Sequence, residues 1–135
     1  MNAAARLGAA LAGLLLAGPA AAGPELDYML HCQGCHLADG AGTPGKIPAL
    51  ADQVGLFLRV PGGRAFLVRV PGVATSALDD AATARLLNWM IPRFGPATEF
   101  APYTADEVAP LRASPLVDVT ETRDALLRAL ASAPD

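Results

Sequence analysis

The chain is poor in positive charge and in long apolar runs, and each shortage excludes a class of protein. Its 135 residues include 10 lysines and arginines against 13 aspartates and glutamates, a formal net charge of −3. This balance argues against nucleic acid or an anionic membrane as the main partner. After residue 22 no apolar stretch approaches the roughly 20 residues that a membrane span needs. The alternation typical of β-strands is almost absent, so we expect one small domain that is mostly α-helical.

The first 22 residues have the pattern of a secretory signal peptide. Arg6 precedes an apolar run from Leu7 to Ala17, and Ala20-Ala21-Ala22 supplies small residues for cleavage before Gly23. A membrane anchor that stays in place is the alternative, but the run is short for a span and Gly18-Pro19 interrupts its end. We therefore expect a cleaved signal (residues 1–22), export to the periplasm and a mature chain without a membrane span.

Cysteine is scarce as well, and the only two stand in the sequence Cys32-Gln33-Gly34-Cys35-His36. Cysteines at this spacing can each form a thioether with a vinyl group of one porphyrin, and the histidine that follows can ligate the iron. A redox-active disulfide would want a βαβ pattern around it, which is not visible. A zinc site would need four tetrahedral ligands from six consecutive residues. The motif therefore predicts one covalently attached haem c, with Cys32 and Cys35 as thioether sites and His36 as the proximal iron ligand.

Hydrophobic spacing and capping residues predict four helices. The first begins at residue 24, runs to about residue 32 and has Leu26, Met29 and Leu30 as its buried face. The second covers residues 78–94 and contains a proline near its end. The third, residues 104–112, opens on the capping-box pair Thr104 and Glu107. The fourth covers residues 120–131, and apolar stretches at 50–60 and 65–70 lie between the motif and the second helix.

The order of these features resembles the class I c-type cytochromes: a helix, the Cys32–His36 motif, a glycine-rich loop, a proline-leucine pair and a helix that carries Trp89. The resemblance covers roughly residues 25–112. It implies an all-α fold wrapped around one haem. We therefore expect a haem domain at residues 23–113, and the predicted fourth helix makes residues 114–135 a helical C-terminal extension. The resemblance also implies that the Pro48 carbonyl accepts a hydrogen bond from His36, although this proline could merely shape its loop. Trp89 would pack the closing helix on the first.

The loop that the resemblance expects to supply the second axial ligand contains no methionine. This loop corresponds to residues 68–76, whereas low-spin members of the family place a methionine there. Met90 is the remaining candidate for the sixth ligand, with a core methionine that lines the haem as the alternative. An iron with an open sixth position is a further possibility.

The two propionates of a haem also need partners, and arginine binds carboxylates with a bidentate fork. Arg64, which follows Gly62-Gly63, is the preferred candidate, with an ordinary surface arginine as the alternative. The function expected from the resemblance is a monomeric one-electron carrier, not an enzyme, that meets redox partners such as a dehydrogenase and its acceptor transiently. The alternatives are a five-coordinate haem protein, acting as a ligand sensor or weak peroxidase, and a fixed subunit of a dehydrogenase docked through residues 116–130.

Overall fold

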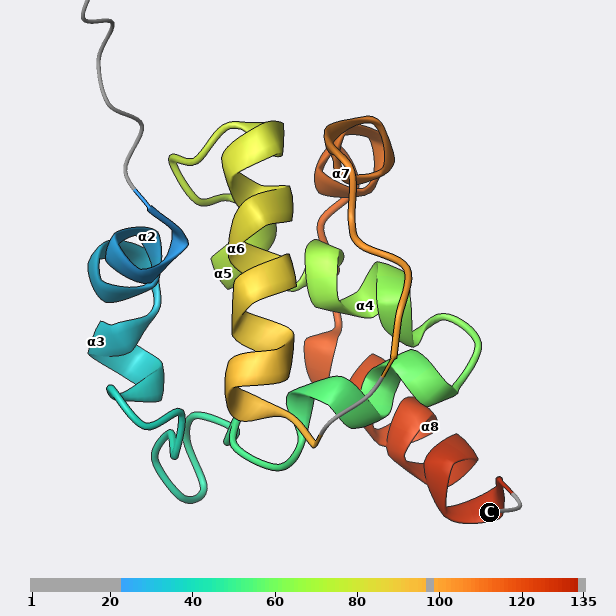
Figure 1. The fold of residues 1–135 in the computed structure, drawn as a ribbon. Coiled ribbons are helices and arrows are strands. Elements are labelled where there is room, and N and C mark those ends of the chain that lie inside the picture. The colour runs from blue at the N-terminus through green and yellow to red at the C-terminus, as the bar shows by residue number, and fades with distance from the viewer. Residues whose placement is uncertain (1–22, 97–98, 134–135) are drawn as a thin grey trace, which may run out of the picture.

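A computed structural model describes residues 23–96 and 99–133, and all regular elements in these ranges are helical (Figure 1). The predicted signal peptide lies outside these ranges. The α-helices are α2 (Pro24–His31), α3 (Gln33–His36), α4 (Gly63–Arg69), α5 (Pro71–Ala74), α6 (Asp80–Phe94), α7 (Ala105–Arg112) and α8 (Val119–Ser132), and η1 (Val54–Arg59) is a 3-10 helix. The expected all-α fold is confirmed. Over the same residues, no helix is both long and apolar enough to cross a membrane.

Helix α2 carries the cysteine motif at its end and packs on α6 through a single aromatic side chain. Tyr28 is 2% exposed, and its ring centre lies 5.7 Å from that of Trp89 and 4.9 Å from that of Phe94. Its hydroxyl donates a 2.7 Å hydrogen bond to the carbonyl of Leu37, just beyond the motif. The expected packing of Trp89 against the first helix is therefore confirmed.

The predicted buried face of this helix is wrong. Leu26, Met29 and Leu30 are 45%, 53% and 67% exposed, so Met29 is not a core residue. The helix has only eight residues, and the two aromatic rings of α6 accept the bulky ring of Tyr28. The three aliphatic side chains consequently point away from the core.

Helix α6 forms the centre of the core and begins and ends at clear signals. The side chain of Asp79 caps it by accepting a 2.7 Å hydrogen bond from the Ala82 backbone N–H. Leu87 and Ile91 are almost wholly buried along its inner face. Pro92 lies inside the helix, which continues to Phe94 and is followed by Gly95; the helix therefore ends at the residue that the sequence predicts.

Residues 50–70 form a second layer of the core, in which η1 packs on α4. The rings of Phe57 and Phe66 lie 5.0 Å apart between them. Gly63 allows this approach, because a Cβ at that position would lie 1.8 Å from the Phe57 carbonyl oxygen. Any larger residue here would force the two elements apart.

The C-terminal helices close the structure over η1, α4 and α5. The Thr104 hydroxyl caps α7 by accepting a hydrogen bond from the Glu107 N–H, as the sequence predicts. Helix α8 packs on η1 and α4, with Leu126 buried in the common core. The expected helix in the C-terminal extension is thus present, and its apolar side faces this chain's own core.

Candidate functional site

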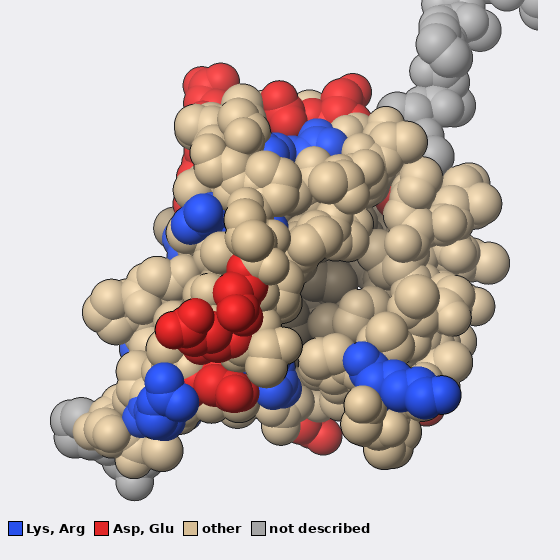
Figure 2. Space-filling model, turned by 180° about the vertical axis from the view of Figure 1, so that it is seen from behind, with Lys and Arg blue, Asp and Glu red and all other residues tan. Residues whose placement is uncertain are grey.

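A cavity of about 360 Å³ opens beside the cysteine motif, and Figure 2 shows it as a hollow in the surface. Its walls come from the end of α2, from α3, from η1 and the loop before it, from α4 and its junction with α5, and from α6 and α8. Most of its lining is aliphatic or aromatic. The lining includes Cys32, Cys35, His36, Pro48, Leu50, Phe57, Phe66, Leu67, Val70, Val73, Met90, Val119 and Arg123.

Both cysteine thiols lie along this cavity and are unpaired. The backbone turns at Cys32, whose carbonyl accepts hydrogen bonds from the N–H groups of Cys35 and His36. Burial, with a smaller contribution from the negative charge of Asp27, raises the pKa of the Cys32 thiol to about 11. A redox-active cysteine needs a lowered pKa, so this environment does not favour the disulfide alternative.

The imidazole of His36 is held by one defined contact. Its Nδ1 lies 3.1 Å from the carbonyl oxygen of Pro48, the hydrogen bond that the resemblance implies. Nδ1 must donate there, which leaves Nε2 unprotonated and available to a metal. Burial lowers the pKa of His36, opposed in part by this hydrogen bond, and so favours the neutral ring.

Gly42 keeps the loop of Pro48 close to His36. Its N–H donates to the His36 carbonyl at 3.1 Å, and its φ of +66° lies in the left-handed region. A Cβ on Gly42 would lie 2.5 Å from the Ile47 carbonyl oxygen and 2.7 Å from that of Pro48. The glycine therefore permits the contact that orients the histidine.

These residues fit a covalently bound haem. Two free thiols and a histidine with one free ring nitrogen lie along the same mostly apolar cavity. A porphyrin offers two vinyl groups to the thiols, an iron to Nε2 and a broad apolar face to the walls. The zinc alternative has no such support, because the described ranges contain no cluster of three histidine, cysteine or acidic side chains that could hold a metal ion.

The cavity wall formed by residues 70–73 offers no side chain that could ligate iron. It consists of Val70, Pro71, Gly72 and Val73. The segment that follows it is fastened by Arg112, whose guanidinium donates to the carbonyls of Ser76 and Leu78 at 2.8 and 2.7 Å. Met90 also lines the cavity, from within α6, and is 5% exposed. Its ligation of the iron stays a prediction.

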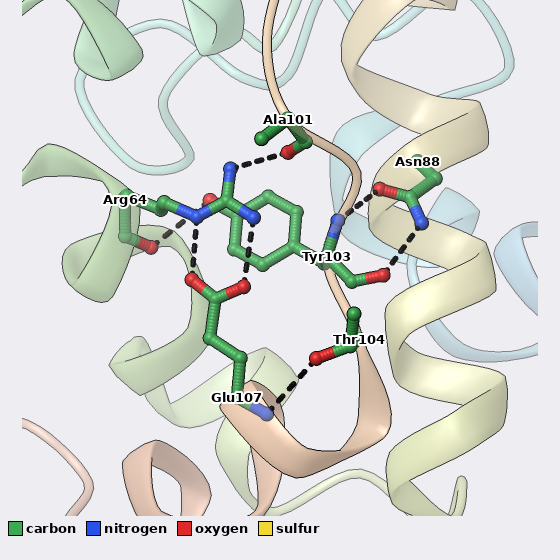
Figure 3. Close-up of polar contacts among 6 residues, drawn as sticks. All are labelled: Arg64, Asn88, Ala101, Tyr103, Thr104 and Glu107. Atoms are coloured by element: carbon green, nitrogen blue, oxygen red, sulfur yellow. Dashed lines mark hydrogen bonds and ion pairs between the residues drawn. The ribbon is translucent and has the colours of Figure 1, made fainter.

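Arg64, the preferred propionate partner, does not line this cavity. Its guanidinium forms two hydrogen bonds with the Glu107 carboxylate and donates a third to the Ala101 carbonyl at 2.7 Å (Figure 3). It also stacks over the ring of Tyr103, 3.8 Å from the ring centre. The Arg64 guanidinium is thus already bound by Glu107 and Tyr103, and it connects α4 to α7. It is therefore not available to a group in the cavity.

The arginine that the structure does bring to the cavity is Arg123 of α8, which no motif in the sequence marks. Its neighbour one turn earlier, Val119, lines the same cavity. The sequence places Arg123 on a predicted helix, but only the docking of that helix on η1 and α4 turns the two side chains toward the cysteine motif.

No protein-family model matches the chain, but two curated proteins do. A cytochrome c-552 from Thermus thermophilus is 35% identical over 128 residues, a match that covers 78% of this chain and 86% of the relative. A second cytochrome c-552 from Thermus thermophilus is 36% identical over 107 residues, covering 64% of this chain and 82% of the relative. Together with the fold and the cavity, this likeness shows that the chain belongs to the class I c-type cytochromes, which carry covalently bound haem c and transfer electrons.

Proposed function

We propose that this protein is a monomeric, exported one-electron carrier of the periplasm that binds one haem c through Cys32 and Cys35, with His36 as the proximal ligand. The observation that carries the proposal is the meeting of the two free thiols with a histidine whose Nδ1 is tied to Pro48. Bound haem c supplies an iron that changes its charge by one electron. The protein holds that group in an apolar setting, with His36 kept in one tautomer and one orientation.

The surface beside the motif suits brief contacts with redox partners. Leu30 and Leu37 flank the motif on either side, and both are exposed together with Leu26 and Met29. Leu26, Met29 and Leu30 share one side of α2, and this helix ends next to His31 and Cys32, which line the cavity. Small contacts of this kind release quickly, as an electron carrier requires. Because the chain is acidic overall, we expect partners with a complementary basic surface.

The proposal is tested by an optical redox titration of the haem-loaded protein, with His36→Ala and His31→Ala as a matched pair. Both histidines line the cavity, but only His36 has the hydrogen bond that prepares a ring nitrogen for the iron. We expect a single one-electron transition in the wild type, an unchanged spectrum in the His31 variant and a loss of the proximal ligand band pattern in the His36 variant. Equal effects of the two substitutions would contradict the assignment.

A second candidate function, binding of a small ligand at an open iron, follows from the cavity wall at residues 70–73, which belongs to the loop where the resemblance expects an axial ligand. Residues 70–73 supply only aliphatic side chains and glycine, and Arg112 fastens the segment behind them. Met90 belongs to a helix that continues past it to Phe94. An iron with one protein ligand binds carbon monoxide readily when reduced, whereas an iron saturated by a thioether does not.

The spectrum of Met90→Leu decides between the two states of the iron. Leucine keeps nearly the same volume, so the substitution should cost less than about 1.5 kcal/mol of stability. If the sixth position is open, the variant has the wild-type high-spin ferric spectrum and the same affinity for carbon monoxide. If the wild type is low-spin and the variant is not, Met90 is the ligand and only the carrier function stands. We do not propose a fixed dehydrogenase subunit, because the apolar side of α8 that it needs packs on η1 and α4.

A further inference from the structure

Arg123 is the only arginine or lysine among the described residues that line the cavity assigned to haem. The remaining walls are mostly aliphatic and aromatic, apart from the motif itself and His31. A haem, by contrast, carries two propionate carboxylates. Burying a carboxylate without a partner is costly, so these groups must either reach solvent or meet a positive side chain at the edge of the cavity.

Arg123 lies at the edge of this cavity. It also lines the neighbouring groove, which is formed by α8 and the loop of residues 41–49 and includes Lys46 and Asp124. Figure 2 shows basic side chains on the lower border of the hollow. The guanidinium thus lies where the apolar interior of the cavity gives way to a polar rim.

The guanidinium is also free to bind an anion. Over residues 23–96 and 99–133 no hydrogen bond or ion pair engages the side chain of Arg123. Three other arginines are committed: Arg64 to Glu107, Arg69 to the Ser114 carbonyl and Arg112 to Asp80 and backbone carbonyls. Within the described part of the chain, a half-buried arginine at the border of an apolar cavity is therefore left without a partner.

The helix that carries Arg123 is held in place independently of any haem. Asp118 caps α8 by accepting a 2.8 Å hydrogen bond from the Glu121 N–H. One turn beyond Arg123, Leu126 and Leu127 pack on the core of η1 and α4. Because the helix is anchored on both sides, the arginine is presented to the cavity at a defined position.

We propose that Arg123 binds a propionate carboxylate of the haem c, so that the C-terminal helix α8 forms part of the haem site. The planar fork of the guanidinium matches a carboxylate. The positive charge would also favour the reduced, less positive form of the iron. The inference rests on the attachment of haem at Cys32 and Cys35 proposed above.

The test compares haem-loaded Arg123→Gln, Arg123→Lys and Arg128→Gln with the wild type. Arg128 is exposed on the same helix and lines neither cavity nor groove, so its variant controls for the loss of charge from α8. The readouts are the propionate bending band in the resonance Raman spectrum and the midpoint potential. Far-UV circular dichroism verifies that α8 remains folded.

We expect Arg123→Gln to shift the propionate band and lower the midpoint potential, Arg123→Lys to cause a smaller change and Arg128→Gln to cause none. Unchanged readouts in Arg123→Gln, or an equal shift in Arg128→Gln, would overturn the inference. Lys46→Gln adds a further control, because an equal band shift there would mean that no specific contact with Arg123 exists. A wild-type chain without thioether-bound haem would instead overturn the proposed function, so the two failures are distinguishable.

Discussion

Removing the ring of Tyr28 should destabilise the protein far more than removing any aliphatic side chain of the same helix. Tyr28 is almost completely buried against the rings of Trp89 and Phe94, and its hydroxyl bonds the Leu37 carbonyl. Truncating a buried aromatic side chain to alanine costs about 3–5 kcal/mol. Removing only the hydroxyl in Tyr28→Phe costs about 1 kcal/mol, the net value of one hydrogen bond.

Leu30→Ala is the matched control, because Leu30 lies on the same helix and is 67% exposed. Its cost should stay within about 0.5 kcal/mol, as for other surface substitutions. The assay is guanidinium unfolding of the haem-loaded proteins followed by far-UV circular dichroism. If Leu30→Ala costs as much as Tyr28→Ala, the helix is packed through its aliphatic face and not through the ring of Tyr28.

Three further predictions concern the site loop, the alkaline stability and the segment behind the cavity. Gly42→Ala should destabilise the protein by more than Gly45→Ala and should alter the absorption bands of the proximal ligand. Both glycines have positive φ, but of the two only Gly42 has carbonyl oxygens within 3 Å of an added Cβ. Equal losses of stability would contradict the role assigned to this loop. Burial raises the pKa of Tyr28 to about 12 from its ordinary 10.0, so wild-type stability should fall as the pH rises from 10 toward 12, and unfolding curves of Tyr28→Phe should show a smaller fall. Arg112→Ala should lower the free energy of unfolding in guanidinium by at least about 2 kcal/mol, because it leaves the partly buried carbonyls of Ser76 and Leu78 without their charged donor. A loss below about 0.5 kcal/mol, the range of ordinary surface substitutions, would mean that Arg112 does not hold this segment.

The parts of this protein that could be predicted from sequence are those encoded by neighbouring residues. The haem motif occupies five consecutive positions, so the sequence alone predicts its chemistry. The caps of α6 and α7 depend on Asp79 and Thr104 and on N–H groups three residues later. Both helices consequently begin within about two residues of their predicted starts.

The errors arose where distant elements decide the outcome. An eight-residue helix has little more than two turns, so hydrophobic spacing alone could not choose between the side of Leu30 and the side of Tyr28. The side of Tyr28 is buried because its ring packs on Trp89, which lies 61 positions along the chain. Arg64 is the propionate partner that the sequence favours, but it binds Glu107 of α7, 43 positions along the chain. Arg123 carries no local signal at all, because only the docking of α8 brings it to the cavity.

The central claim is that Cys32 and Cys35 bind one haem covalently, and peptide mass spectrometry of the purified protein tests it most directly. Trypsin should cut after Lys46, the first lysine or arginine that follows the motif, so one peptide ending there contains both cysteines and His36. We predict that this peptide carries the mass of one haem and resists thiol alkylation. A peptide without haem whose two thiols react with iodoacetamide would contradict the account.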